Sequence, residues 1–158
     1  MDVLRALSEW PAAEMLRRSA VAYPLVNAAH IASVGLLLGA IATLDLRLLG
    51  AFRAHPLAHL APPLVRVASG GLLAASATGL LLFSTRPLTY AQNPAFLAKL
   101  GLVGLGLLNA LVLRQNRRWC EVVAGREPVP GSIRAAALAS LLVWPAAVVA
   151  GRWIGFLQ

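Results

Sequence analysis

The stretch SAVAYPLVNAAHIASVGLLLGAIATL, residues 19–44, contains no Asp, Glu, Lys or Arg. A helix needs roughly 20 apolar residues to cross the hydrocarbon core of a bilayer, with a range of about 17–25. Two more charge-free runs follow, at residues 67–85 and 135–151. Residues 87–113 contain a single charge, that of Lys99. The sequence therefore predicts an all-α integral membrane protein, a four-helix bundle that runs up-down-up-down.

The composition supports one membrane domain. Only 13% of the 158 residues are charged, against about a quarter in an average soluble domain. The expected spans cover residues 23–44, 64–83, 95–113 and 135–153, within a transmembrane domain of residues 21–158. Residues 1–20 mix apolar and charged side chains, which favours a short interfacial helix over a disordered tail.

The formal net charge of +8 comes mainly from Arg at the ends of the apolar runs. The side with the termini and the second loop carries Arg5, Arg17, Arg18, Arg86 and Arg152. The other side carries Arg47, Arg53, Arg66, Arg114, Arg117, Arg118, Arg126 and Arg134. The positive-inside rule places this more basic side in the cytoplasm, with both termini periplasmic, in a bacterial inner membrane. The Arg side chains are then expected to interact with the lipid bilayer, and binding of a nucleic acid is not expected.

Ionisable groups inside apolar spans are costly and are read as functional by default. His30 lies early in the first span and Lys99 early in the third. With a rise of 1.5 Å per residue, both should lie roughly 6–11 Å inside the outer end. Thr78, on the second span, falls near the same level, and Asn27 lies one turn from His30. These four residues are the predicted binding site.

A neutral imidazole is a good axial ligand for haem iron, and helix bundles hold cofactors between facing helices. His30 is therefore the candidate iron ligand of haem b, and Lys99 the candidate partner of a propionate or another anion. The structural alternative is that Lys99 reaches the headgroups and that His30 satisfies a hydrogen bond between helices.

Three more polar residues lie in or near the spans. Asp45 is expected to pair with Arg47 or with Arg114 across the bundle, or else to admit protons or contact an anion. Asn109 shares a helix face with Lys99, and is expected to make a hydrogen bond between helices rather than contact a substrate.

The polar residues and their neighbours carry a resemblance over residues 23–113. Its elements are His30, Asp45-Leu46-Arg47-Leu48-Leu49-Gly50, Thr78-Gly79-Leu80-Leu81-Leu82-Phe83, Tyr90, Asn93, Phe96, Lys99 and Asn109. This order resembles that of an uncharacterised family of small bacterial four-helix membrane proteins.

More remotely, the layout is similar to the bacterial membrane protoporphyrinogen oxidase of the haem pathway. The copper-resistance D-type membrane proteins share a similar early His. The resemblance to the oxidase implies haem b, with His30, Arg47 and Lys99 at its functional positions. Asn109 stands where that family would carry a further His.

The leading interpretation is a membrane haem-b-binding or redox protein built on the His30/Lys99 site. Two alternatives stay open. The chain would be a non-catalytic subunit or assembly factor whose Gly-rich faces bind other membrane subunits or a second copy. Otherwise it would be a small transporter of a solute or metal. The common signatures of nucleotide-binding, metalloprotease and serine-hydrolase enzymes are absent from the sequence.

Overall fold

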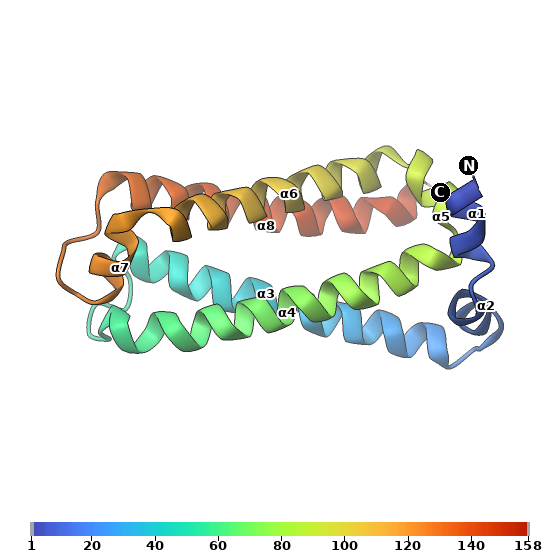
Figure 1. The fold of residues 1–158 in the computed structure, drawn as a ribbon, viewed down its shortest axis with the longest axis horizontal. Coiled ribbons are helices and arrows are strands. Elements are labelled where there is room, and N and C mark those ends of the chain that lie inside the picture. Colours follow the sequence, from blue (N-terminus) through green and yellow to red (C-terminus); the bar gives the residue numbers. More distant parts are fainter. Residues whose placement is uncertain (1, 158) are drawn as a thin grey trace.

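The computed structural model describes residues 2–157, which form helices joined by short connections (Figure 1). The four long helices are α3 (Ala22–Leu49), α4 (Leu57–Thr85), α6 (Pro94–Gln115) and α8 (Gly131–Trp153). All four are long and apolar enough to cross a membrane. The short ones are α1 (Asp2–Ser8), α2 (Pro11–Arg18), α5 (Pro87–Gln92), α7 (Arg117–Val123) and the 3-10 turn η1 (Ile154–Phe156). The chain is thus an all-α, multi-pass membrane bundle.

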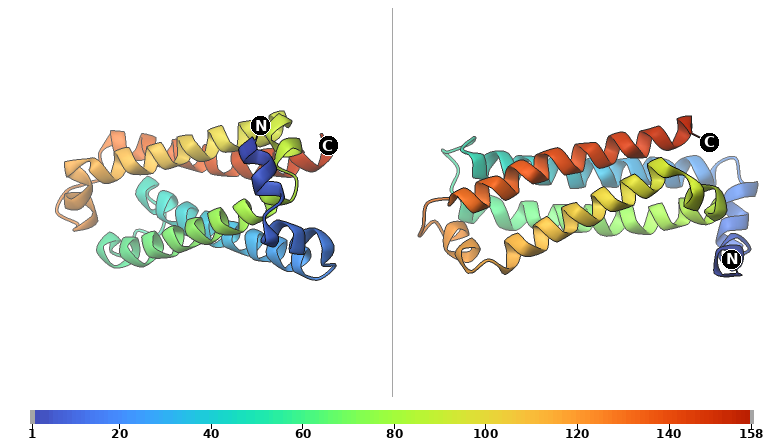
Figure 2. Two further views of the ribbon diagram at one scale, coloured as in Figure 1. Left: turned by 45° about the vertical axis from the view of Figure 1, so that its right-hand side comes forward. Right: turned by 90° about the horizontal axis from the view of Figure 1, so that it is seen from above.

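The long helices form two hairpins that lie one above the other (Figures 1 and 2). Helix α3 packs along α4, and α6 along α8, while α3 and α8 join the two hairpins. One end of the bundle carries the α3–α4 loop and α7, and is called here the basic end. The opposite end carries α1, α2, α5 and both termini, and is called the termini end. From the basic end, α3 and α8 diverge toward the termini end (Figure 1).

The largest cluster of buried side chains joins the hairpins at the basic end. It comprises Leu48, Leu57, Ala61, Val122, Ile133 and Ala137, from α3, α4, α7 and α8. Val122 is only 2% exposed, so α7 closes this end of the bundle although it lies outside the spans. Burial of this apolar cluster holds the hairpins together at the basic end.

Some helix boundaries differ from the expected span limits, and the N-terminal segment differs in form. Helix α4 begins at Leu57 rather than at residue 64, and contains Pro62 and Pro63. The missing proline N–H groups are tolerated because Leu57 and Ala61 are buried in the core and fix these turns. Helix α3 continues to Leu49 and ends at Gly50, whose φ of +112° favours glycine. The N-terminal segment forms two short helices, α1 and α2, instead of one.

The backbones of α3 and α4 approach closely at Gly71 of α4. A Cβ atom there would lie 2.8 Å from the Leu37 nitrogen and 2.9 Å from the Ser33 oxygen of α3. Gly35 and Gly39 of α3 form a small-xxx-small step, a pattern that lets another helix approach closely. Nothing in the described part of the chain lies within 4 Å of a Cβ at either position. These two glycines lie on a face of α3 that no other helix covers.

Gly71→Ala should destabilise the protein, because its methyl group would meet the backbone of α3. Overpacking of this kind costs about 1–3 kcal/mol. The neighbouring Gly70 is the matched control, since nothing lies within 4 Å of a Cβ there. Gly70→Ala should leave the thermal unfolding temperature in detergent unchanged or raise it slightly, because Ala favours helix. Equal unfolding temperatures for the two variants would show that α3 and α4 do not approach at Gly71.

Candidate functional site

His30 of α3 lies beside Thr78 of α4, with 3.0 Å between Nδ1 and Oγ1. The Thr78 hydroxyl donates its own proton to the Ala74 carbonyl, at 2.7 Å. It can therefore only accept from the ring, so the proton of a neutral His30 lies on Nδ1. This arrangement leaves the Nε2 lone pair of His30 free to bind a metal or accept a proton.

Gly79 makes room for the His30 ring. A Cβ at this position would lie 3.2 Å from His30 Cε1, closer than most side-chain contacts. The Thr78-Gly79 pair on α4 thus supplies both the acceptor that orients the ring and the space that the ring occupies. Within the first hairpin, the position of the imidazole is fixed by two adjacent residues of one helix.

Lys99 belongs to the other hairpin. Its side chain lies along α8 at Gly151, where a Cβ would be 3.4–3.6 Å from Lys99 Cδ, Cε and Nζ. The ammonium group is close enough to act electrostatically on the His30 ring. Among the described residues it makes no hydrogen bond or ion pair. The two groups, one from each hairpin, therefore share a region of the bundle, and Lys99 retains its full donor capacity.

Asn27 does not join this group. Its side chain is exposed and makes no hydrogen bond within the described residues. Three residues along a helix correspond to an offset of about 60° around its axis. That rotation turns Asn27 away from α4, although it lies only one turn from His30.

An aromatic cluster that the sequence analysis did not single out lies next to these residues. The ring centroids of Phe83, Tyr90 and Phe96 are 5.3–6.1 Å apart. Phe83 is one turn beyond Gly79, and Phe96 one turn before Lys99, on the side of the termini end. The enrichment of aromatic residues at membrane interfaces was the signal that could have found them.

Asp45 is buried between α3 and α8 and is only 5% exposed. Its carboxyl group interacts with the Ser140 hydroxyl of α8, but Oδ2 has no hydrogen-bond partner in the described chain. The expected ion pair with Arg47 or Arg114 is absent from the described residues. Arg47 lies two residues farther on, and i,i+2 side chains do not face each other on a helix. Its Nε instead donates to the His55 carbonyl, at 2.9 Å.

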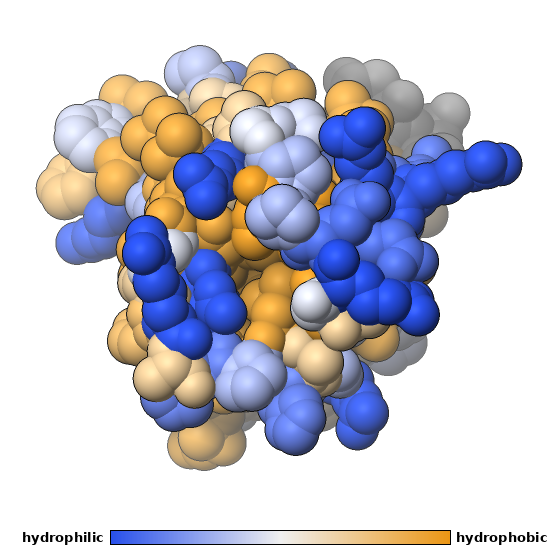
Figure 3. All heavy atoms as spheres, turned by 90° about the vertical axis from the view of Figure 1, so that its left-hand side faces the viewer, coloured by the Kyte–Doolittle hydropathy of each residue, from blue (hydrophilic) through white to orange (hydrophobic). Residues whose placement is uncertain are grey.

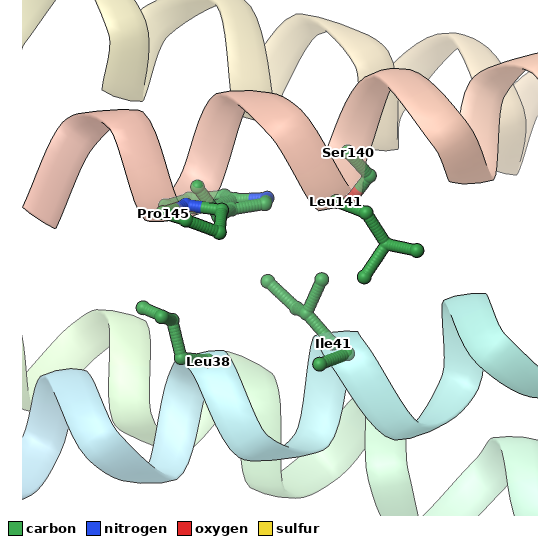
Figure 4. A pocket seen from close by; sticks show the side chains of 7 residues that line it. Leu38, Ile41, Ser140, Leu141 and Pro145 are labelled. Carbon is green, nitrogen blue, oxygen red and sulfur yellow. The ribbon is translucent and has the colours of Figure 1, made fainter.

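Ser140 also lines a small pocket between α3 and α8 (Figure 4). Its volume is about 20 Å³, and its other lining residues are Leu38, Ile41, Ala42, Leu141, Trp144 and Pro145. A cavity needs only about 10–15 Å³ to hold one water molecule. This space is therefore too small for an organic ligand, and the interface of α3 with α8 is a packing surface.

Asn109 makes a hydrogen bond between helices, of the type that the sequence predicted. Its Nδ2 donates to the Ala136 carbonyl of α8, at 3.0 Å. Gly106, one turn earlier on α6, packs against Trp144, since a Cβ there would lie 2.8 Å from the indole. Asn109 thus belongs to the interface of α6 with α8, and the cofactor candidates remain His30 and Lys99.

The model of one protein family matches residues 17–157, and that family is described as "Family of unknown function (DUF6644)". The match includes all four spans, together with His30, Thr78, Lys99 and the aromatic cluster. No curated protein and no solved structure matches the chain. The assignment of a function therefore depends on the geometry of the residues themselves.

Asp45→Asn should raise the unfolding temperature in detergent at neutral pH. The amide keeps the shape of the side chain but removes an acid whose Oδ2 is buried without a partner. A gain of about 1 kcal/mol corresponds to roughly 2–4 °C for a chain of this size. Glu9→Gln makes the same change of charge on an exposed side chain and should have no measurable effect. A lower unfolding temperature for Asp45→Asn would mean that the carboxyl group has a partner that the fold does not reveal.

Proposed function

We propose a function for this chain, which belongs to the DUF6644 family of unknown function: it holds haem b in the membrane through His30 and takes part in redox chemistry. The hydrogen bond from His30 Nδ1 to Thr78 Oγ1 carries the proposal. Ligating imidazoles almost always donate their other ring N–H to a fixed acceptor, which sets the tautomer and the ring orientation. Thr78 supplies such an acceptor, and Nε2 is left as the iron ligand.

Lys99 supplies the second feature that fits haem. It is the only Lys in the chain, and among described residues its ammonium group makes neither a hydrogen bond nor an ion pair. A haem carries two propionates, and a cation without a partner at the level of His30 would bind one of them. A bound haem b would supply one-electron transfer, while His30 holds the iron and Lys99 holds the propionate.

The aromatic cluster has a role in the same proposal. Phe83, Tyr90 and Phe96 lie between the His30/Lys99 level and the termini end, and pack on one another. Their apolar bulk would limit the access of water from that end, which keeps the local dielectric low and tunes the redox potential of a cofactor.

The distribution of Arg sets the proposed location. We place the protein in a bacterial inner membrane, with the basic end in the cytoplasm and both termini in the periplasm. In this orientation His30 and Lys99 lie toward the periplasmic leaflet. Electrons would then enter or leave the site on that side of the membrane.

A second candidate function is that of an accessory subunit in a larger membrane complex. Four glycines of two spans, Gly35, Gly39, Gly101 and Gly104, would have nothing within 4 Å of an added Cβ. Exposed glycines let a helix of another chain approach closely. In that case the Gly-bearing faces of α3 and α6 would bind partner helices, and His30 and Lys99 would be structural.

The visible spectrum of the protein purified in detergent tests the haem proposal. A Soret band is expected, and His30→Ala should abolish it. His59→Ala removes an exposed His at the basic end and is the matched control, which should keep the full band. If the band were absent, or equally strong in both variants, His30 would not be the ligand. Co-purification of other membrane subunits without haem would favour the accessory function.

Thr78→Val provides a second, graded test of the same ligand. Loss of an outer-shell hydrogen-bond partner typically lowers metal affinity about 10–100-fold. We therefore expect Thr78→Val to weaken haem retention, measured by transfer of haem to an acceptor protein, without abolishing it. Thr43→Val is the control, because the Thr43 hydroxyl bonds only to the Gly39 carbonyl of its own helix. Equal haem transfer from the two variants would show that Thr78 does not orient the ligand.

A further inference from the structure

The basic end carries a hollow of about 300 Å³, separate from the His30/Lys99 site. It lies between the start of α4, helix α7 and the loop that follows α7. Its lining residues are Arg47, Pro56, Leu57, Ala58, Val122, Ala124, Gly125, Glu127, Pro128 and Val129. Figure 3, which faces this end, shows apolar surface in a central hollow surrounded by hydrophilic side chains. The volume is at the lower end of the range for small-molecule sites, roughly 300–1,000 Å³.

Arg47 is the single cation among the lining residues. It lies in the last turn of α3, where the span reaches the end of the membrane. Its Nε is bonded to the His55 carbonyl, and this bond holds the guanidinium at the edge of the hollow. The two terminal nitrogens make no hydrogen bond and no ion pair within the described chain. Two N–H-bearing nitrogens of a fixed guanidinium are suited to bind a phosphate in a bidentate manner.

The surroundings of the hollow favour an anion. The other cations of the basic end are Arg53, Arg66, Arg114, Arg117, Arg118, Arg126 and Arg134. The acidic side chains here are Asp45, which is buried against α8, Glu121, which is paired with Arg126, and Glu127, which is exposed on the rim. Positive charge therefore exceeds negative charge, even though one carboxylate lines the hollow itself.

We propose that this hollow binds one anionic phospholipid, with its phosphate on Arg47 and the start of an acyl chain on Pro56, Ala58 and Val129. Charge complementarity explains why the headgroup would be anionic. The apolar lining explains why the ligand would have an acyl chain, which a free phosphate or another soluble anion lacks. Basic pockets at the ends of membrane helices bind acidic headgroups in this way. Since Val129 packs against the buried cluster that joins the hairpins, the lipid would extend that cluster.

Native mass spectrometry of the detergent-purified protein with phosphatidylglycerol, and with phosphatidylcholine as the neutral reference, tests the proposal. One tightly held phosphatidylglycerol is expected. Arg47→Gln should weaken it about fivefold, the effect of one cation near a headgroup. Arg53→Gln is the matched control, because Arg53 is at the same end but outside the lining, with its Nε on the Gly50 carbonyl. It should change the affinity by less than about twofold.

A third variant probes the apolar part without a change of charge. Ala58→Leu adds an apolar side chain to the wall of the hollow and should reduce lipid binding, while inorganic phosphate should not displace the lipid. The proposal is overturned if Arg47→Gln and Arg53→Gln weaken binding equally, which would indicate diffuse surface charge. It is also overturned if phosphate competes fully or if Ala58→Leu has no effect. Ala58→Leu keeps the test decisive even if Arg47→Gln, which loses the His55 contact, fails to fold.

Discussion

Hydrocarbon offers no hydrogen-bond partner, so each polar group within the spans has to find one inside the protein. Asn109 bonds to the backbone of α8, and the His30 ring to Thr78. Several groups in the described spans depart from this rule: the Asn27 side chain and the Lys99 ammonium make no bond, and Asp45 Oδ2 is buried in the protein without a partner. Because a polar group without a partner destabilises the protein, binding of a ligand, a proton or a water molecule at these groups would stabilise it most.

Properties that depend on position along one helix could be predicted from the sequence. Charge-free runs located the four spans, because a membrane selects for length and hydropathy alone. The constant rise per residue placed His30 and Thr78 at one level, and the structure has them in hydrogen-bond contact. Asn109 was expected to bond across helices, since an amide in lipid has few other choices.

Properties that depend on rotation about the helix axis could not be predicted in this way. The sequence shows small residues at Gly35 and Gly39 as clearly as at Gly71, but only Gly71 meets another backbone. In the same way, Asn27 turns outward and Asp45 faces Ser140 rather than Arg47. The packing of all four helices together decides which face of a helix meets which neighbour. The sequence does not reveal this, because a membrane helix that is apolar on all sides has almost no amphipathic pattern.

The two ends of the bundle differ in which side chains join the hairpins, and this bears on function. At the basic end, a buried cluster that includes Val122 of α7 holds them together. Toward the termini end, α3 and α8 diverge, and His30 and Lys99 come from different hairpins (Figure 1). A ligand that touches both residues would therefore connect the two hairpins beside the aromatic cluster, where Phe83 of α4 stacks on Phe96 of α6. Since a ligand stabilises the state that binds it, occupation of this site would add a second connection between the hairpins on the side of the termini end.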